Sequence, residues 1–373
     1  MDRETNIDSI RALDDRIREN ATIALKRTQN SLLNVSKIPP EVLGNIFRWN
    51  TIPEGDFGGL EKGSHNFLAV CHHWFEVATH TPELWNFWGN TPEDWSRRYR
   101  RSKTTPLDLV LGDYGYDGSY FDADLEDALR DRAAKDTIRR VHLAAGDTKL
   151  LRSIIASLIA NPKEIRSNSI VSLVLQNQNK VPLDIPDFFT YYRFPKLQRL
   201  ELRNCTIASC DHLTARTSVL TTLKLDFGYT SPIPTTLQLL SILASNPALQ
   251  EVELTNRAVP IDNGAESSSR VHLHDLKKLH LHGDLGHVLK FLHRLDLPRN
   301  MDHLSLTLEG CNLLDIPQIV GPYLRDHPQR RDRAQGGLNL FLTSGHRTYR
   351  APHITLRVGD GRGIDFSDPA QDK

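Results

Sequence analysis

The chain is poor in the residues that mark secreted, metal-bound or membrane-spanning proteins. Its 373 residues include only four cysteines, and none of them forms a Cys-x-x-Cys pair. Free thiols in a reducing compartment are therefore expected, which places the protein in the cytoplasm, the nucleus or both. The first residues are too charged for a secretory signal. The most apolar run, residues 150–160, contains Arg152 and is too short to cross a bilayer, so no membrane partner is expected.

The chain also lacks an excess of charge and any catalytic signature. Its 46 basic residues balance 46 acidic ones, a composition that does not favour nucleic acid as a partner. The patterns G-x-S-x-G, H-E-x-x-H and G-x-x-x-x-G-K-[ST] are missing. We therefore predict a protein that is not an enzyme, with no catalytic residue and no cofactor.

Histidine is the one metal-ligand type that clusters. Six of the sixteen histidines fall between residues 272 and 293, and His280 and His282 would point to the same side of a strand. Zinc takes about four ligands, but no cysteine or carboxylate stands at a recognised motif spacing beside these histidines. The pattern favours a protein-binding surface, and we predict no metal site.

A repeated pattern, Leu-x-x-Leu-x-Leu with Ile, Val or Met substitutions, organises the second part of the chain. Its first members are 23 to 32 residues apart, close to the period of about 20–29 residues of leucine-rich repeats. Helix-like segments lie between the matches, at residues 150–160, 186–192, 237–244 and 285–292. The matches are Ile138/Val141/Leu143, Ile170/Leu173/Leu175, Leu197/Leu200/Leu202, Leu220/Leu223/Leu225, Leu249/Val252/Leu254, Leu276/Leu279/Leu281 and Met301/Leu304/Leu306.

These matches predict an α/β fold, a leucine-rich-repeat-like solenoid with parallel strands on one face and helices and loops on the other. The apolar residues of each strand would point inward, and the residues between them would form one exposed surface. We expect a protein substrate to bind there, with an acidic segment of that substrate near Lys278, His280 and His282. The predicted substrate-binding residues are Arg199, Glu201, Arg203, Lys224, Glu253, Lys278, His280 and His282.

Three short amphipathic helices are predicted before the repeats. The first begins at Ile38-Pro39-Pro40-Glu41, where proline suits the first turn, and continues with an apolar face through Ile46-Phe47. A second runs from Phe67 to Ala78. Thr81 would cap a third that starts at Pro82. Helices this short cannot bury much surface alone, so the segment requires a partner in the chain or in another protein.

These blocks resemble an F-box. The resemblance rests on Ile38-Pro39-Pro40-Glu41-Val42-Leu43, Val70-Cys71…Trp74, and Pro82-Glu83-Leu84-Trp85, and covers roughly an eighth of the chain. It is strongest to the F-box proteins abundant in mushroom-forming fungi, whose sequences also resemble this chain at residues 101–102 and 106–109. The family implies docking on the Skp-type linker of a cullin–RING (SCF) ubiquitin ligase. The residues that would contact this linker are Pro39, Val42, Ile46, Val70, Cys71 and Trp74.

We accordingly divide the chain into an N-terminal helix (1–33), an F-box (34–90), a junction (91–135), a repeat domain (136–358) and a disordered tail (359–373). The N-terminal helix has a stripe that includes Ile10, Leu13 and Ile17, which is compatible with a coiled-coil pair or with packing on the F-box. Arg97, Arg98, Arg100 and Arg101 would form a solvated basic face. Two functions remain open: a ligase adaptor, or a leucine-rich interaction scaffold whose F-box-like helices are only a cap.

Overall fold

The computed structural model describes most of the chain between Asp2 and Val358. The described residues are 2–51, 66–89, 95–112, 123–159, 169–185, 194–207, 210–211, 213, 219–227, 234–256, 258–260, 270–298, 301–309, 338–343 and 353–358. They form two compact units, Met1–Val110 and Leu111–Lys373. In the described residues, no helix is both long enough and apolar enough to span a membrane. The predicted helix at 186–192 and the predicted tail at 359–373 lie outside these ranges.

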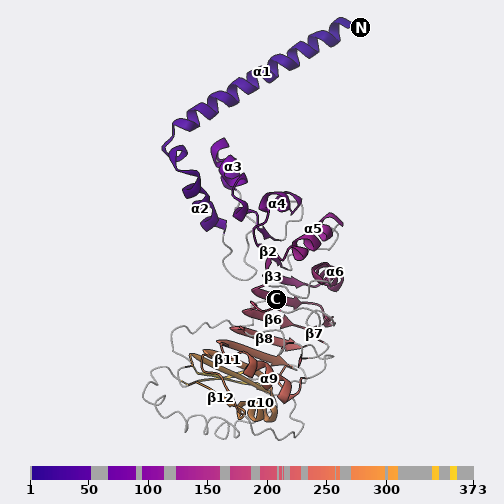
Figure 1. Ribbon diagram of the computed structural model, residues 1–373, viewed down its shortest axis with the longest axis vertical. Coiled ribbons are helices and arrows are strands. Elements are labelled where there is room, and N and C mark those ends of the chain that lie inside the picture. The colour runs from indigo at the N-terminus through magenta and orange to yellow at the C-terminus, as the bar shows by residue number, and fades with distance from the viewer. Residues whose placement is uncertain are drawn as a thin grey trace. The chain divides into compact units, whose positions relative to one another are not determined.

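The first unit is mainly helical (Figure 1). Its helices are α1 (Asp2–Leu32), η1 (Asn34–Lys37), α2 (Pro40–Thr51), η2 (Asn66–Ala69), α3 (His72–Thr79), η3 (Pro82–Leu84) and α4 (Trp95–Ser102). It also contains the strand β1 (Phe87–Trp88) and all but the last residue of β2 (Leu107–Leu111), which pairs with β1 in parallel. Side chains of α1 from residue 11 onward are exposed except for Asn30, which is half-buried.

The second helix of the predicted F-box is divided in two. The prediction of one helix from Phe67 to Ala78 is wrong, because η2 ends at Ala69 and Cys71 has an extended backbone before α3 begins. This break lets Phe67 stack on Phe47, with ring centroids 4.5 Å apart, while α3 brings Val77 to the same core. Packing of the aromatic rings thus overrides the helical period of the local sequence.

The second unit is built around a large sheet, and the predicted α/β class is confirmed. Its helices are α5 (Ala123–Ala134), α6 (Thr148–Ile159), α9 (Thr236–Ser245) and α10 (Leu285–Leu292). The sheet strands are β3 (Ile138–Ala145), β4 (Ser172–Asn177), β6 (Arg199–Arg203), β8 (Thr222–Phe227), β9 (Glu251–Asn256), β11 (Lys278–Asp284), β13 (His303–Glu309), β14 (Leu338–Thr343) and β15 (His353–Val358). Short parallel pairs join β5 (Leu183–Asp184) to β7 (Cys205–Thr206) and β10 (Val271–His272) to β12 (Leu295–Asp296).

The strands of this sheet follow one another in the order β3-β4-β6-β8-β9-β11-β13-β15-β14. Figure 1 labels β3, β6, β8 and β11 along this order. The first seven are parallel, and β15 is antiparallel to both β13 and β14. Leucines of the repeated pattern lie in register, so that Leu202 pairs with Leu225 and Leu225 pairs with Leu254. Every member of the seven predicted matches is buried.

Candidate interaction surfaces

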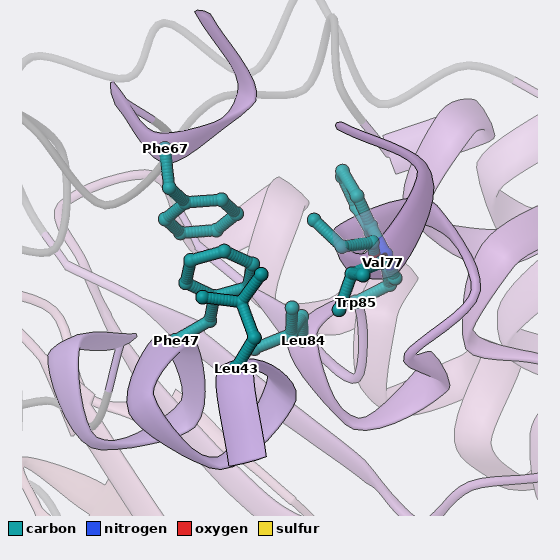
Figure 2. Packing of buried hydrophobic residues seen from close by; sticks show 7 residues of the cluster. Leu43, Phe47, Phe67, Val77, Leu84 and Trp85 are labelled. Carbon is teal, nitrogen blue, oxygen red and sulfur yellow. Dashed lines mark hydrogen bonds between the residues drawn. The ribbon is translucent and has the colours of Figure 1, made fainter. Parts of the chain in front are cut away.

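Helix α2 has one buried side and one exposed apolar side. Leu43 and Phe47, four residues apart, enter the hydrophobic cluster with Phe67, Leu84 and Trp85, as Figure 2 shows. Helix α2 can approach Thr81 closely because residue 44 is glycine: a Cβ there would lie only 3.2 Å from the hydroxyl oxygen of Thr81. These contacts fix which side of α2 remains exposed.

The exposed side of α2 carries a stripe of large apolar residues. Val42 is 48% exposed and Ile46 is 40% exposed, although each neighbours a residue that is fully buried. Trp49 follows at the next turn and is 78% exposed. Positions 42, 46 and 49 share one helical face because they are spaced by four and three residues. Such a stripe in water is typical of an interaction surface.

All the predicted linker-binding residues keep some accessible surface. Pro39 and Val70 are exposed with Val42 and Ile46, whereas Cys71 and Trp74 are half-buried. Trp74 also packs against Phe47, with ring centroids 5.1 Å apart, so part of its ring belongs to the core. We call the six predicted residues together with Trp49 the docking surface. Trp49 was not among the residues predicted from the sequence, although its spacing of three residues from Ile46 could have identified it.

The four arginines of α4 form the expected solvated face only in part, because Arg97 and Arg100 are exposed whereas Arg98 and Arg101 are not. Arg98 is buried and donates a hydrogen bond of 2.7 Å from Nη1 to the carbonyl oxygen of Phe87. The guanidinium of Arg101 lies 4.4 Å from the ring centroid of Trp85 and 5.8 Å from that of Phe75, within cation–π distance. Thr81 does not cap η3 with its side chain; its hydroxyl instead donates to the carbonyl of Val77.

The second candidate surface is the sheet face opposite the repeated leucines, which we call the charged face. On β6 its residues are Arg199, Glu201 and Arg203, and Glu201 is the central one. A carboxylate oxygen of Glu201 lies 2.9 Å from Nη2 of Arg199, and the other lies 2.7 Å from Nε of Arg203. Gln176 on β4 donates a further hydrogen bond of 2.7 Å to Glu201.

These contacts bury Glu201, whose side chain is only 2% exposed. The expectation that this residue lies on an open surface is therefore wrong: the two arginines and Gln176 cover it. Burial alone would raise the pKa of Glu201, but the hydrogen bonds from Arg199 and Gln176 and the charge of Arg203 outweigh it and lower the pKa. Glu201 thus remains ionised and anchors the charged face.

The ion pairs continue onto the next two strands. Nζ of Lys224 on β8 lies 2.9 Å from a carboxylate oxygen of Glu251 and 3.4 Å from one of Glu253, both on β9. Arg203 also reaches Glu253 at 3.7 Å. Burial opposes the charge of Lys224, yet the pairing with Glu251 and Glu253 raises its pKa. Five predicted substrate-binding residues, those from β6, β8 and β9, are thus joined in one network.

The other three predicted residues lie at one side of this network, on β11. Lys278 is exposed, whereas His280 and His282 are half-buried. In the register of the sheet, Lys278 lies beside Glu251 and His280 beside Glu253. Within the described ranges, no group of three or more histidine, cysteine or acidic residues is arranged to hold a metal ion. This side of the charged face thus carries one exposed lysine and two half-buried histidines.

Gln176 belongs to the network but was not among the residues predicted from the sequence. It follows Leu175 on β4 as Arg203 follows Leu202 on β6, and the register pairs the two polar residues directly. Its place in the repeated pattern could therefore have identified it. No family model matches this chain, and no curated protein matches it either.

Proposed function

We propose that this protein is the substrate-recognition adaptor of an SCF-type ubiquitin ligase. The docking surface binds the Skp-type linker, which connects the adaptor to the cullin. One observation carries the proposal: the segment that resembles an F-box has its own hydrophobic cluster, yet leaves Val42, Ile46 and Val70 exposed. Those three are among the residues that the resemblance assigns to linker binding.

The energetic reason for such an interface is the exposed apolar stripe of α2. Its residues would lose contact with water when a partner covers them, and burial of apolar surface contributes roughly 25 cal/mol per Å². Interfaces of this kind depend on a few buried anchors, among which tryptophan is frequent. Trp49 extends the stripe by one turn and adds the largest apolar side chain available on α2.

The second unit supplies the substrate-binding part of the proposal. Successive parallel strands pair in register and bury equivalent leucines, which supports a leucine-rich-repeat-like domain. The charged face then binds a protein substrate. Arg203 and Lys278 keep accessible charge for such contacts, although Arg203 is already paired with Glu201. An adaptor of this kind performs no bond chemistry and instead raises the effective concentration of substrate lysines near the conjugating enzyme.

The alternative function is a leucine-rich interaction scaffold with no ligase role. The register of the sheet supports the scaffold and the adaptor equally, because the repeats do not depend on the N-terminal motif. The docking surface separates the two functions, since a scaffold whose first helices are only a cap has no reason to bind the linker.

The test is binding of a purified Skp-type linker to the full chain, measured with single variants. Val42→Asp or Ile46→Asp should weaken binding by about thirtyfold or more, because loss of an interface anchor commonly costs about 2 kcal/mol. Ser96→Asp is the matched control: it adds the same charge at an exposed position of another helix of the same unit. Equal linker binding by all of these variants, or no binding by the native chain, would refute the adaptor role.

A further inference from the structure

Helix α1 has an apolar stripe that the described residues of its own unit leave exposed. Leu13 and Ile17 are each 58% exposed, and Ala21 and Ala24 continue the same face at spacings of four and three residues. The opposite face carries Asp15 and other polar residues. Tertiary packing of an amphipathic face provides most of the stability of helices in proteins. A long helix of this kind is therefore expected to have a partner.

We propose that this partner is α1 of a second copy of the chain, in antiparallel orientation. If the two helices cross at Ile17, Leu13 of one copy lies opposite Ala21 of the other. A large side chain then meets a small one on each side of the centre, which allows the two helices to approach closely. A parallel pair would instead place Leu13 against Leu13 and Ala21 against Ala21.

The charges of the sequence favour the same orientation. Residues 2–10 contain three acidic and one basic residue, a formal charge of −2, whereas residues 24–32 contain two basic residues, a charge of +2. An antiparallel pair centred on Ile17 brings these two segments together, and it also aligns the helix dipoles favourably. A parallel pair would place like charges side by side. This self-association does not depend on linker binding.

The first measurement is the mass of the full chain in solution, by light scattering over a range of concentrations. We expect a concentration-dependent rise toward twice 42.3 kDa. Ile17→Asp should weaken self-association by more than about a hundredfold, because each dimer would bury two carboxylates. Thr22→Asp is the control, since Thr22 is exposed on the opposite face and its hydroxyl donates a hydrogen bond to the carbonyl oxygen of Arg18 in the same helix. Circular dichroism establishes that both variants remain folded.

The second measurement determines the orientation. Single variants Leu13→Cys and Ala21→Cys are mixed and oxidised, and the disulfide-linked peptides are identified by mass spectrometry, with the native chain as background. Links between positions 13 and 21 support the antiparallel pair. Links that join position 13 to itself would overturn it. A monomeric native chain, a dimer that persists in Ile17→Asp, or equal loss in Thr22→Asp would also overturn the proposal.

Discussion

Replacement of Leu225 by alanine is the sharpest test of how the second unit is held together. Leu225 is 1% exposed and lies in the register between Leu202 of β6 and Leu254 of β9. Both of these neighbours are fully buried. The shortened side chain would leave a cavity between two strands that are themselves fixed by their own pairing, so the surroundings cannot easily collapse into it.

The expected loss of stability follows from the groups removed. Each buried methyl-sized group contributes about 0.8 kcal/mol, so the atoms lost from Leu225 account for about 2 kcal/mol. The cavity adds to this, and substitutions of this type cost roughly 2–5 kcal/mol in total. With a urea dependence of about 1–3 kcal/mol per M, the unfolding midpoint should fall by on the order of 1 M.

Hydrogen–deuterium exchange in increasing urea, followed on peptides from β6, β8 and β9, measures the loss of stability in these strands themselves. Leu237→Ala on α9 is the matched control: it is the same substitution in the same unit, at a side chain that is 47% exposed. The control should change the midpoint little. If Leu225→Ala lowered the midpoint no more than Leu237→Ala, the leucines would not form the core of the sheet and the reasoning would fail.

Two further predictions concern buried polar groups. Glu201→Gln should lower the free energy of unfolding by about 1–3 kcal/mol at neutral pH, because it leaves two arginines without their carboxylate. The pKa of Glu201 is lowered in the folded state, so ionised Glu201 contributes its full stabilisation above the ordinary carboxyl pKa and loses it as the pH falls through the lowered value. Urea titrations of the native chain and of Glu201→Gln should therefore give converging free energies of unfolding in acid. A difference that stays constant with pH would contradict this. Burial raises the pKa of Cys205 and Cys210 to about 12, so iodoacetamide should modify half-buried Cys71 well before either of them, and peptide mass spectrometry would expose the reverse order.

The arrangement of the sheet could be predicted from the sequence because its signal is local and repeated. Leucines at fixed offsets determine which side of each strand is buried, and every member of the seven predicted matches is buried in the structure. Helix α10, Leu285–Leu292, also has its predicted bounds, since Asp284 caps it by accepting hydrogen bonds from the amides of Gly286 and His287. Each of these features depends on neighbouring residues.

The features that could not be predicted depend on residues far apart in the chain. Alternation along β6 places Glu201 on the polar side, but its burial results from Gln176 on another strand together with two flanking arginines. Similarly, the apolar period continues unbroken through Cys71, and only the stacking of Phe67 on Phe47 reveals why the helix stops there. Sequence periodicity determines on which side of a strand or helix a residue lies, whereas its burial depends on the residues that the fold brings next to it.

The order of the last strands has a consequence for synthesis of the chain on the ribosome. From β3 to β13, each strand of the sheet can pair with one made shortly before it, so the sheet can grow as the chain emerges. The final pair breaks this rule, because β15 separates β14 from β13. Among the described strands, β14 pairs with β15, so it is synthesised before its partner and can pair only after β15 has been made. Ribosome-bound chains that end before His353 would carry a sheet edge at β13 that neither β15 nor β14 covers.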